Sequence, residues 1–399
     1  MADKFFFSRD TKVSIIMNSG VFDVPILDGF SFSQAQNIQD ITFNEAADAD
    51  GNSTRGREAV VNSVAPAEWS FQTYIRPFKT TGSGSTTADR NGGANKHHLV
   101  EEVLWALLAG ANSYVSTDGS TDPAFQRTST VTGVSAADVI AFSTSSSGST
   151  LNFTSSNKTT LGTADFEFIL GANDDSNDKV YKITSCVVNE VTIDFDLDGI
   201  ATASWSGFGT LITDEGNSDT TVTVNEDIAA TDNMIRNRLS AVKVVGSSPS
   251  VNPYKITLTG GSVTISNNIT YLTPEILGQV NTPLGHVTGT RSVTGTLTCY
   301  LNDLSASSAN LFEDVIEDNL TTRKNAFAIT LFIGGETGGS TGEFSALVAP
   351  GMKISMPTCH LEIPTHSFDD IISTEINFHA LPSTVDGTNE ISAIDFVGA

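Results

Sequence analysis

The sequence predicts an all-β protein in which one strand-rich unit, carrying one helix, occurs twice. The 399 residues include 33 Gly and only 17% charged residues, and short apolar runs alternate with turn residues, a composition typical of β proteins. Helical periodicity is confined to residues 96–114 and 310–321. The strands around these two stretches follow the same order, which predicts a duplicated domain.

The two helical stretches align with each other when Leu99 is set on Leu311. Apolar residues then match apolar residues, and the pair Glu101 and Glu102 matches a second acidic pair. In both copies the apolar residues fall on one helical face, so the acids are expected on the opposite face. The expected N-caps are Asn95 and either Ser307 or Ser308, and the expected end of the first helix is Gly110.

The first half begins with short strands over residues 11–43, separated by NSG and LDG turns. Residues 44–65 are polar, carry charges of both signs and show neither the helical nor the strand period of apolar residues, so we expect a long loop there. A strand over 66–78 and a flexible linker lead to the helix. Residues 112–164 are interpreted as a surface insertion with some β content. The remaining predicted strands are 166–171, 179–188 and 191–212, with a hairpin turn at Asp198 and Gly199.

The second half repeats this order after a polar stretch at 213–235. Residues 276–293 stand where the first half has its long loop. The matching residues include Tyr74 with Tyr300, Phe71 with Leu297, Cys186 with Cys359, Phe195 with Phe368, Asp196 with Asp369 and Trp205 with Phe378. The predicted organisation is therefore a first domain at 1–212, a linker at 213–235 and a second domain at 236–399.

The composition argues against several classes of protein. The formal net charge of −25, from 46 acids and 21 bases, opposes binding to nucleic-acid phosphates, which requires clustered Lys and Arg. Three cysteines at wide spacing indicate buried thiols rather than a disulfide framework or a zinc site. We expect neither a signal peptide nor a membrane span, because no apolar stretch is long enough.

Two patterns of acidic residues resemble metal sites but are better explained as structural. Asp194, Asp196 and Asp198 match the start of a calcium loop, but its twelfth position is Trp205 instead of Glu. Alternation with apolar residues favours a strand with its acids in water. His97 and His98 stand four residues before Glu101 and Glu102 without a third ligand, which favours a solvent-exposed first helical turn over a metal site. Without a nucleophile motif or a complete phosphate loop, we expect no enzyme, metal or cofactor.

Several stretches together carry a family resemblance. SIIMNSGVFDVPILDGFSFSQAQNIQDITF, AEWSFQTYIRPF, the single helix and ITSCVVNEVTIDFDLDGIATASWSGFG resemble a major tail tube protein of tailed bacteriophages. The resemblance implies a β-sandwich or barrel with one flanking helix in each domain. It also implies rings stacked into the hollow tube through which phage DNA passes during ejection, without specific binding.

The resemblance further implies a ring-stacking contact in the long loop. The candidate residues are Glu45, Asp48, Asp50, Arg55, Arg57 and Glu58. With two domains per chain we expect three chains in a pseudo-hexameric ring, the alternative being six chains with one domain of each outside the inner barrel. We expect much of the negative charge to line the lumen.

The implied location is the virion, with assembly in the host cytoplasm. The implied partners are other copies of the chain and the tape measure, terminator and baseplate or tip proteins, and no membrane. Two other classes stay open: a carbohydrate- or receptor-binding β-rich decoration or tail protein, and a hydrolase decorated with β domains.

Overall fold

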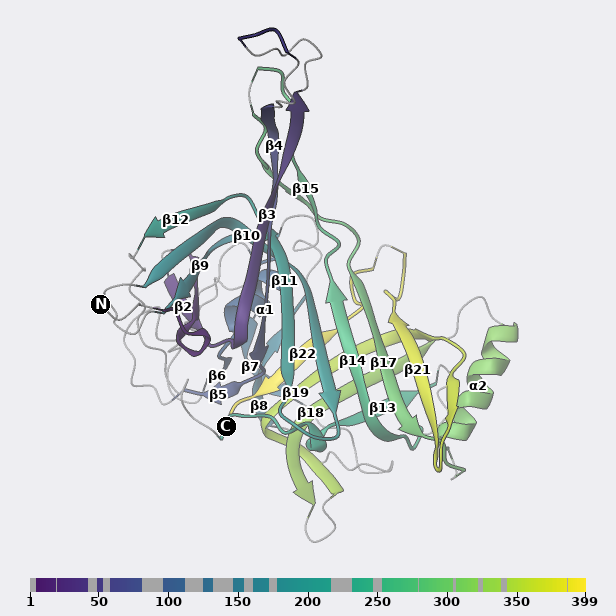
Figure 1. The fold of residues 1–399 in the computed structure, drawn as a ribbon. Helices are drawn as coiled ribbons and strands as arrows, with labels where there is room; N and C mark the ends of the chain where they lie inside the picture. The colour runs from purple at the N-terminus through teal and green to yellow at the C-terminus, as the bar shows by residue number, and fades with distance from the viewer. Residues whose placement is uncertain are drawn as a thin grey trace.

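Strands dominate the computed structural model of the chain. It describes residues 5–18, 20–41, 49–52, 58–80, 96–111, 125–131, 146–153, 161–171, 178–216, 232–246, 253–278, 280–303, 306–321, 326–338, 343–385 and 387–399. Over these residues the fold is mostly β with two α-helices (Figure 1). The predicted all-β-dominated class is therefore correct.

Eight antiparallel strands form one sheet that crosses the whole molecule, here called the long sheet. In spatial order they are β3 (Leu27–Ile41), β4 (Glu58–Tyr74), β11 (Thr202–Gly209), β10 (Lys179–Asp196), β14 (Thr257–Ser266), β17 (Ser292–Tyr300), β21 (Ile372–Ala380) and β20 (Thr365–Phe368). The two halves of the sequence meet in this sheet, because β10 pairs with β14 from Glu190 opposite Ser266 to Asp196 opposite Gly260. The halves are thus joined by a β-ladder.

The other strands extend the pairing on the far side of the core. One group is β2 (Gly20–Val24), β1 (Lys12–Met17), β9 (Ala164–Leu170), the first part of β10, and β12 (Ile212–Gly216). The other group is β13 (Ala241–Val245), β18 (Phe327–Gly338), β19 (Glu343–Leu361), β22 (Ala393–Val397), β8 (Ser146–Leu151) and β7 (Phe125–Val131). The remaining elements are β5 (Pro77–Lys79), β6 (His97–Leu99), β15 (Thr270–Leu272), β16 (Gly285–Val287), α1 (Glu102–Ala109), α2 (Ser308–Thr321) and the 3₁₀ turns η1 (Ser8–Asp10) and η3 (Asn237–Leu239).

The order of strand pairing is the same in the two halves. In the first half it runs β3, β4, β11, β10, β9, β1. In the second half it runs β14, β17, β21, β19, β18, β13. Each half also has its helix between the second of these strands and the strand that corresponds to β9.

The pairing corrects one part of the alignment between the halves. Trp205 lies opposite Phe71, whereas the residue opposite Leu297 is Ile376. Since Phe71 corresponds to Leu297, Ile376 rather than Phe378 takes the place of Trp205. The two-residue slip went unseen in the sequence because a shift of two keeps every side chain on the same face of a strand.

The helix α1 begins later than predicted, at Glu102, and lies wholly inside the core. Residues 97–99 form β6 instead, paired with β5, and the Val100 amide donates to the Arg76 carbonyl at 3.1 Å. The predicted N-cap Asn95 lies outside the described residues. At the other end Gly110 closes the helix in the left-handed region at φ 90°, as predicted.

Burial of the acids on α1 contradicts the predicted exposed face. Glu101 accepts a hydrogen bond from the Trp105 indole at 3.2 Å, and Glu102 accepts from the Leu99 amide at 3.1 Å. Both carboxylates are at most 1% exposed. They satisfy buried donors at the start of the helix, where negative charge is also favoured by the helix dipole.

The helix α2 matches its prediction better and lies at the outer edge of the second half (Figure 1). It follows Ser307, whose amide donates to the Asn310 side chain at 3.2 Å and whose carbonyl accepts from Leu311 at 3.0 Å. Leu311 and Val315 are buried while Glu313 is exposed. The two helices therefore share a sequence pattern but occupy different surroundings.

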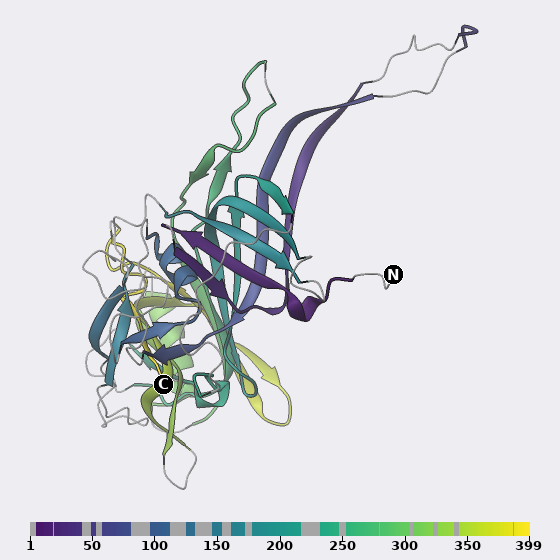
Figure 2. The same ribbon diagram turned by 90° about the vertical axis from the view of Figure 1, so that its left-hand side faces the viewer.

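Two hairpin arms rise from one end of the molecule, here called the upper end (Figures 1 and 2). In the first arm β3 and β4 remain paired as far as Ile41 and Glu58, so residues 58–65 are strand and not the predicted loop. None of these side chains is buried on either face, and such a strand shows no hydrophobic period. The second arm carries β15 and β16, and Asn281 ties it to the first through hydrogen bonds with the Asn62 and Val64 backbone.

The stretch predicted as a surface insertion, residues 112–164, contributes to the core where it is described. Its strands β7 and β8 pair with each other, and β8 pairs with β22 near the C-terminus. Phe125, Leu151 and Phe153 are buried. The prediction of β content was right and that of a purely surface position was wrong.

Candidate functional site

The long sheet has one apolar and one polar face, and the polar face is the candidate functional site. Successive residues of a strand point to opposite sides, so every second residue of these strands lies on the same face. The polar face includes Ser31, Ser33, Glu68, Ser70, Gln72, Glu190, Thr192, Asp194, Asp196, Ser204, Ser206, Ser262, Thr264, Thr294, Thr296, Thr298, Glu375 and Asn377, none of them buried.

Hydroxyl groups bridge neighbouring strands across this face. Ser31 and Ser70 lie 2.9 Å apart, Thr192 and Thr264 3.0 Å, and Ser262 and Thr296 3.2 Å, measured between side-chain oxygens. Gln72 donates to the Ser204 hydroxyl at 2.9 Å. Cross-strand pairs of this kind stabilise a sheet and satisfy its polar side chains within the sheet. The resulting surface is rich in hydroxyl groups.

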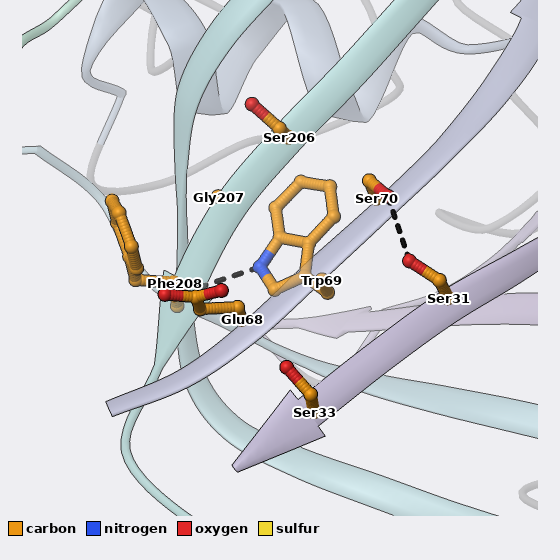
Figure 3. A pocket seen from close by; sticks show the side chains of 8 residues that line it. All are labelled: Ser31, Ser33, Glu68, Trp69, Ser70, Ser206, Gly207 and Phe208. Carbon is orange, nitrogen blue, oxygen red and sulfur yellow. Dashed lines mark hydrogen bonds between the residues drawn. The ribbon is translucent and has the colours of Figure 1, made fainter. Parts of the chain in front are cut away.

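Figure 3 shows a shallow hollow in this face between β3, β4 and β11. Serine side chains, including Ser31 and Ser33, and the Glu68 carboxylate surround it, and the Trp69 indole donates to the Phe208 carbonyl at 3.3 Å. A Cβ atom on Gly207 would come within 2.4 Å of the Trp69 ring. Trp69 and Gly207 pack together on the opposite face of the sheet and so form the floor of the hollow, which holds no convergent catalytic groups.

The polar face carries acids but no Lys or Arg, and His379 on this face lies 3.0 Å from Glu362. Its acids are Glu68, Glu190, Asp194, Asp196 and Glu375, joined at the rim by Glu362. The strands β3, β4, β11, β14, β17, β20 and β21 contain no Lys or Arg, and neither does the part of β10 that pairs with β11 and β14, residues 187–196, in a chain with 21 Lys and Arg residues. Burial raises the pKa of Asp194 above its usual value. The face repels anions along its whole length.

Aromatic rings packed over glycines hold the opposite face against the core. Trp69 lies opposite Gly207, Phe195 opposite Gly261, and in the second half Gly295 lies opposite Phe378. In each pair a Cβ on the glycine would lie less than 3.0 Å from the ring. These pairs fix the register of the sheet, since a slip of one residue would turn the rings into solvent.

The long sheet ends in two strands with unpaired edges. Within the described residues β3 pairs only with β4, and β20 pairs only with β21. Phe368 on β20 is 78% exposed although Phe195, its counterpart on β10, is 3% exposed. An open edge with an exposed aromatic side chain is a site for pairing with another chain.

The six loop residues predicted from the sequence are only partly located. Asp50 lies exposed near the tip of the first arm, and Glu58 lies exposed at the start of β4 opposite Ile41. Glu45, Asp48, Arg55 and Arg57 lie outside the described residues. Where the structure places these residues, they are at the far end of an arm, away from the polar face (Figure 2).

The other ionisable residues singled out from the sequence are structural. His98 lies 3.1 Å from Glu102 with both side chains fully buried, so the expected exposed helical turn is wrong. His97 accepts a hydrogen bond from the Gly398 amide at 2.9 Å, and burial lowers its pKa to about 4. All three cysteines are buried free thiols, as predicted. No cluster of metal-ligating side chains and no helix able to cross a membrane occurs in the described part of the chain.

Sequence reasoning missed the residues of the polar face as a group. Each strand separately shows hydrophobic alternation, but nothing local reveals that eight strands from both halves align their polar residues on one surface. The available signal was the absence of Lys and Arg from seven of these strands and from residues 187–196 of β10, which is visible in the sequence.

Comparison with known proteins agrees with this architecture. The family model described as phage tail tube protein matches residues 81–380. The tail tube protein pb6 of Escherichia phage T5 is 30% identical over 374 residues, which cover 92% of this chain and 69% of pb6.

Proposed function

Because the chain belongs to the phage tail tube protein family, whose members are non-enzymatic components of the virion tail that self-assemble into the tube, we propose that three copies close each ring. Each copy then contributes two tube units, one from each half. The first unit covers residues 1–212, the second covers 236–399, and 213–235 connects them. The identical order of strand pairing in the two halves supports this division.

The contact between the halves is the model for the contact between chains. Inside the chain, β10 of the first unit pairs with β14 of the second. At the free edges, β20 takes the place of the last part of β10, and β3 takes the place of β14. The reason is that β19 and β20 follow each other along the chain in the same way as the first and last parts of β10. Pairing β20 of one chain with β3 of the next repeats the same joint and closes the ring without an exposed edge.

The register of the internal joint specifies the register of the external one. Phe195 opposite Gly261 corresponds to Phe368 opposite Phe30 of the next chain, and Asp194 opposite Ser262 corresponds to Ser367 opposite Ser31. Phe368 is then covered by an aromatic neighbour, which accounts for its exposure in a single chain.

The polar face of the long sheet lines the lumen in this arrangement. The single observation that carries the proposal is that the strand segments that form the polar face contribute acids from both halves and contain no Lys or Arg. A basic wall would neutralise DNA phosphates and hold the genome, whereas an acidic wall repels it over about one Debye length, roughly 8 Å at physiological salt. DNA passes along such a surface without binding.

The first arm is proposed to stack one ring on the next. Its tip extends beyond the body of the sheet at the upper end (Figure 2), and Asp50 and Glu58 are exposed on it. Together with Glu45, Asp48, Arg55 and Arg57 they provide charges of both signs, which suits ion pairs across a ring boundary. The ends of the tube meet the tape measure, terminator and baseplate or tip proteins.

The rival arrangement has six chains per ring, with one half of each chain outside the inner barrel. It is disfavoured because β10 and β14 already join both halves in one sheet with a common polar face. Moving one half outward would break this ladder and would expose the apolar face that Phe195 and Val263 bury.

A cross-link at the proposed joint tests the number of chains per ring. In the variant Ser31→Cys with Ser367→Cys, the two new thiols are expected opposite each other between neighbouring chains, and the three native thiols are buried. Oxidation of assembled tubes should give a closed covalent product of three chains under denaturing conditions. Either single variant is the control and should stay monomeric. A ladder that closes at six chains, or no cross-link in tubes that form, would refute the trimeric ring.

A further inference from the structure

The second arm carries a concentration of exposed apolar side chains that its own fold leaves in solvent. Leu277 at the turn is fully exposed and Leu284 is 70% exposed. The other members are Leu272, Ile276, Val280 and Val287, between 48% and 54% exposed. Glu275 is the only Asp, Glu, Lys or Arg in the sequence 270–287. We call residues 270–287 the apolar arm. A patch of this kind on a projecting hairpin marks an interaction site.

The apolar arm is held in place at its polar side. Asn281 is buried, its backbone bonds to Val64 and Asn62 of the first arm, and its side chain accepts from the Ile276 amide at 3.0 Å. The exposed apolar side chains therefore project from an anchored hairpin. A positioned hairpin loses little conformational freedom when it docks.

A groove lined mainly by apolar side chains is formed by segments far from the arms. The turn between β10 and β11 and the β18–β19 hairpin, which contribute to it, lie at the lower end of the molecule (Figure 1). The lining of the groove comes from the β10–β11 turn, the segment around η3 and the base of the β18–β19 hairpin. The apolar side chains are Ile200, Met234, Leu239, Ala349 and Pro350, and Asp232 and Arg236 also line the groove. Its volume of about 330 Å³ is within the range of about 300–1,000 Å³ seen for binding pockets.

The groove is rigidly built. The Ala201 amide donates to the Ile235 carbonyl at 2.9 Å, and the Asn237 amide donates to the Gly199 carbonyl at 3.1 Å. These bonds fix the segment around η3 against the β10–β11 turn, where Leu197 is a further exposed apolar side chain. The floor is thus preformed in the single chain.

A projection and a cavity at opposite ends of one molecule suit a head-to-tail contact between identical copies. Contacts of this heterologous type propagate along an axis instead of closing on themselves. The strands of the long sheet run between the two ends (Figure 1), so this axis is the one along which rings would stack. Apolar side chains predominate on both surfaces, which makes the two surfaces complementary to each other, whereas the first arm is charged.

We propose that the apolar arm of one chain inserts Ile276, Leu277 and Val280 into this groove of a second copy in the adjoining ring. The proposal rests on the proposed function, because it requires stacked rings. Each chain then makes two chemically different stacking contacts, one through the charged tip of the first arm and one through the apolar arm.

Substitution at the arm tip provides the first test. Leu277 is fully exposed in the single chain, so its replacement removes no packing that stabilises the fold. Leu277→Asp should remain folded and should raise the protein concentration needed for tube formation by about tenfold or more, the factor expected for one buried aliphatic side chain. The matched control is Val385→Asp, at a fully exposed position outside the arm and the groove. Normal tube formation by Leu277→Asp would contradict the proposal.

Cross-linking identifies the partner surface. Chains with Leu277→Cys are mixed with chains with Met234→Cys, assembled, and treated with a short bismaleimide. Covalent dimers that appear only in tubes support the insertion, and the pair Leu277→Cys with Val385→Cys should give none. Tubes without the dimer overturn the docking site while leaving the tube function intact. A wild-type chain that forms neither rings nor tubes would instead overturn the proposed function itself.

Discussion

Trp105 of α1 meets Trp205 of β11 edge to face, with ring centroids 4.9 Å apart and ring planes at 82°. Each indole also donates a hydrogen bond inside the core, to Glu101 at 3.2 Å and to Thr73 at 2.9 Å respectively. The contact joins the only fully buried helix of the described residues to the back of the long sheet. The helix is therefore a support for the polar face.

Truncation of this contact should destabilise the chain without touching any proposed interface. Trp105→Ala removes a fully buried ring and should lower the free energy of unfolding by about 3–5 kcal/mol. It also leaves the Glu101 carboxylate without its indole donor. Trp105→Phe should cost less, since most of the packing remains. Urea unfolding followed by circular dichroism measures both changes, and a loss below about 1 kcal/mol for Trp105→Ala would contradict the account of the core.

Acid should destabilise the fold through His97. Its pKa falls to about 4 mainly through burial, with further lowering by Lys79 and His98. Between pH 6.5 and 4 the unfolded chain therefore binds more protons at this residue than the folded chain, and stability decreases as the pH falls through this window. Protonation also removes the acceptor that holds the Gly398 amide.

The variant His97→Gln isolates this effect, because an amide oxygen can accept the same hydrogen bond without titrating. Between pH 7 and pH 4 the wild type should lose roughly 3 kcal/mol more stability than the variant. The comparison requires urea unfolding at several pH values for both proteins. Identical pH profiles for the two proteins would show that His97 does not contribute.

Reversal of charge on the polar face should slow DNA passage. Glu68→Lys with Asp194→Lys adds bases at two exposed positions of the long sheet, where each can release counterions from a phosphate. Phages assembled with this variant should eject DNA more slowly, with the difference diminishing at high salt. Glu313→Lys on the outer helix α2 is the control with the same charge change per site. Unchanged ejection in the double variant would count against an acidic lumen.

Shortening the first arm should separate ring formation from stacking. Replacing residues 44–56 with a short Gly-rich turn keeps β3 and β4 paired up to Ile41 and Glu58. The variant should fold and form single rings because both free edges of the long sheet are retained. Electron microscopy should show rings in place of tubes. Tubes of normal length would exclude the charged tip as a stacking contact.

Much of the fold was readable from the sequence because strands buried on one face alternate. The pattern in β10 and β11, the turn at Asp198 and Gly199 and the stop at Gly110 are all local signals. The amphipathic face of α2 was likewise correct. These features depend on interactions between residues close together in the chain.

The failures share a physical cause, which is burial or exposure set by distant residues. Glu101 and Glu102 follow the pattern of an exposed helical face, yet β6 and the core surround them. Residues 58–65 form a strand without hydrophobic alternation because neither face of the arm is buried. The β10–β14 ladder could not be foreseen, since no local signal states which strand lies beside which.

Helical reconstruction of the assembled tube by electron cryomicroscopy tests the central claim most directly. The account predicts three chains per ring, β20 of each chain paired with β3 of the next, and the polar faces of both halves lining one continuous channel. Six chains per ring, with only one half of each lining the channel, would contradict it.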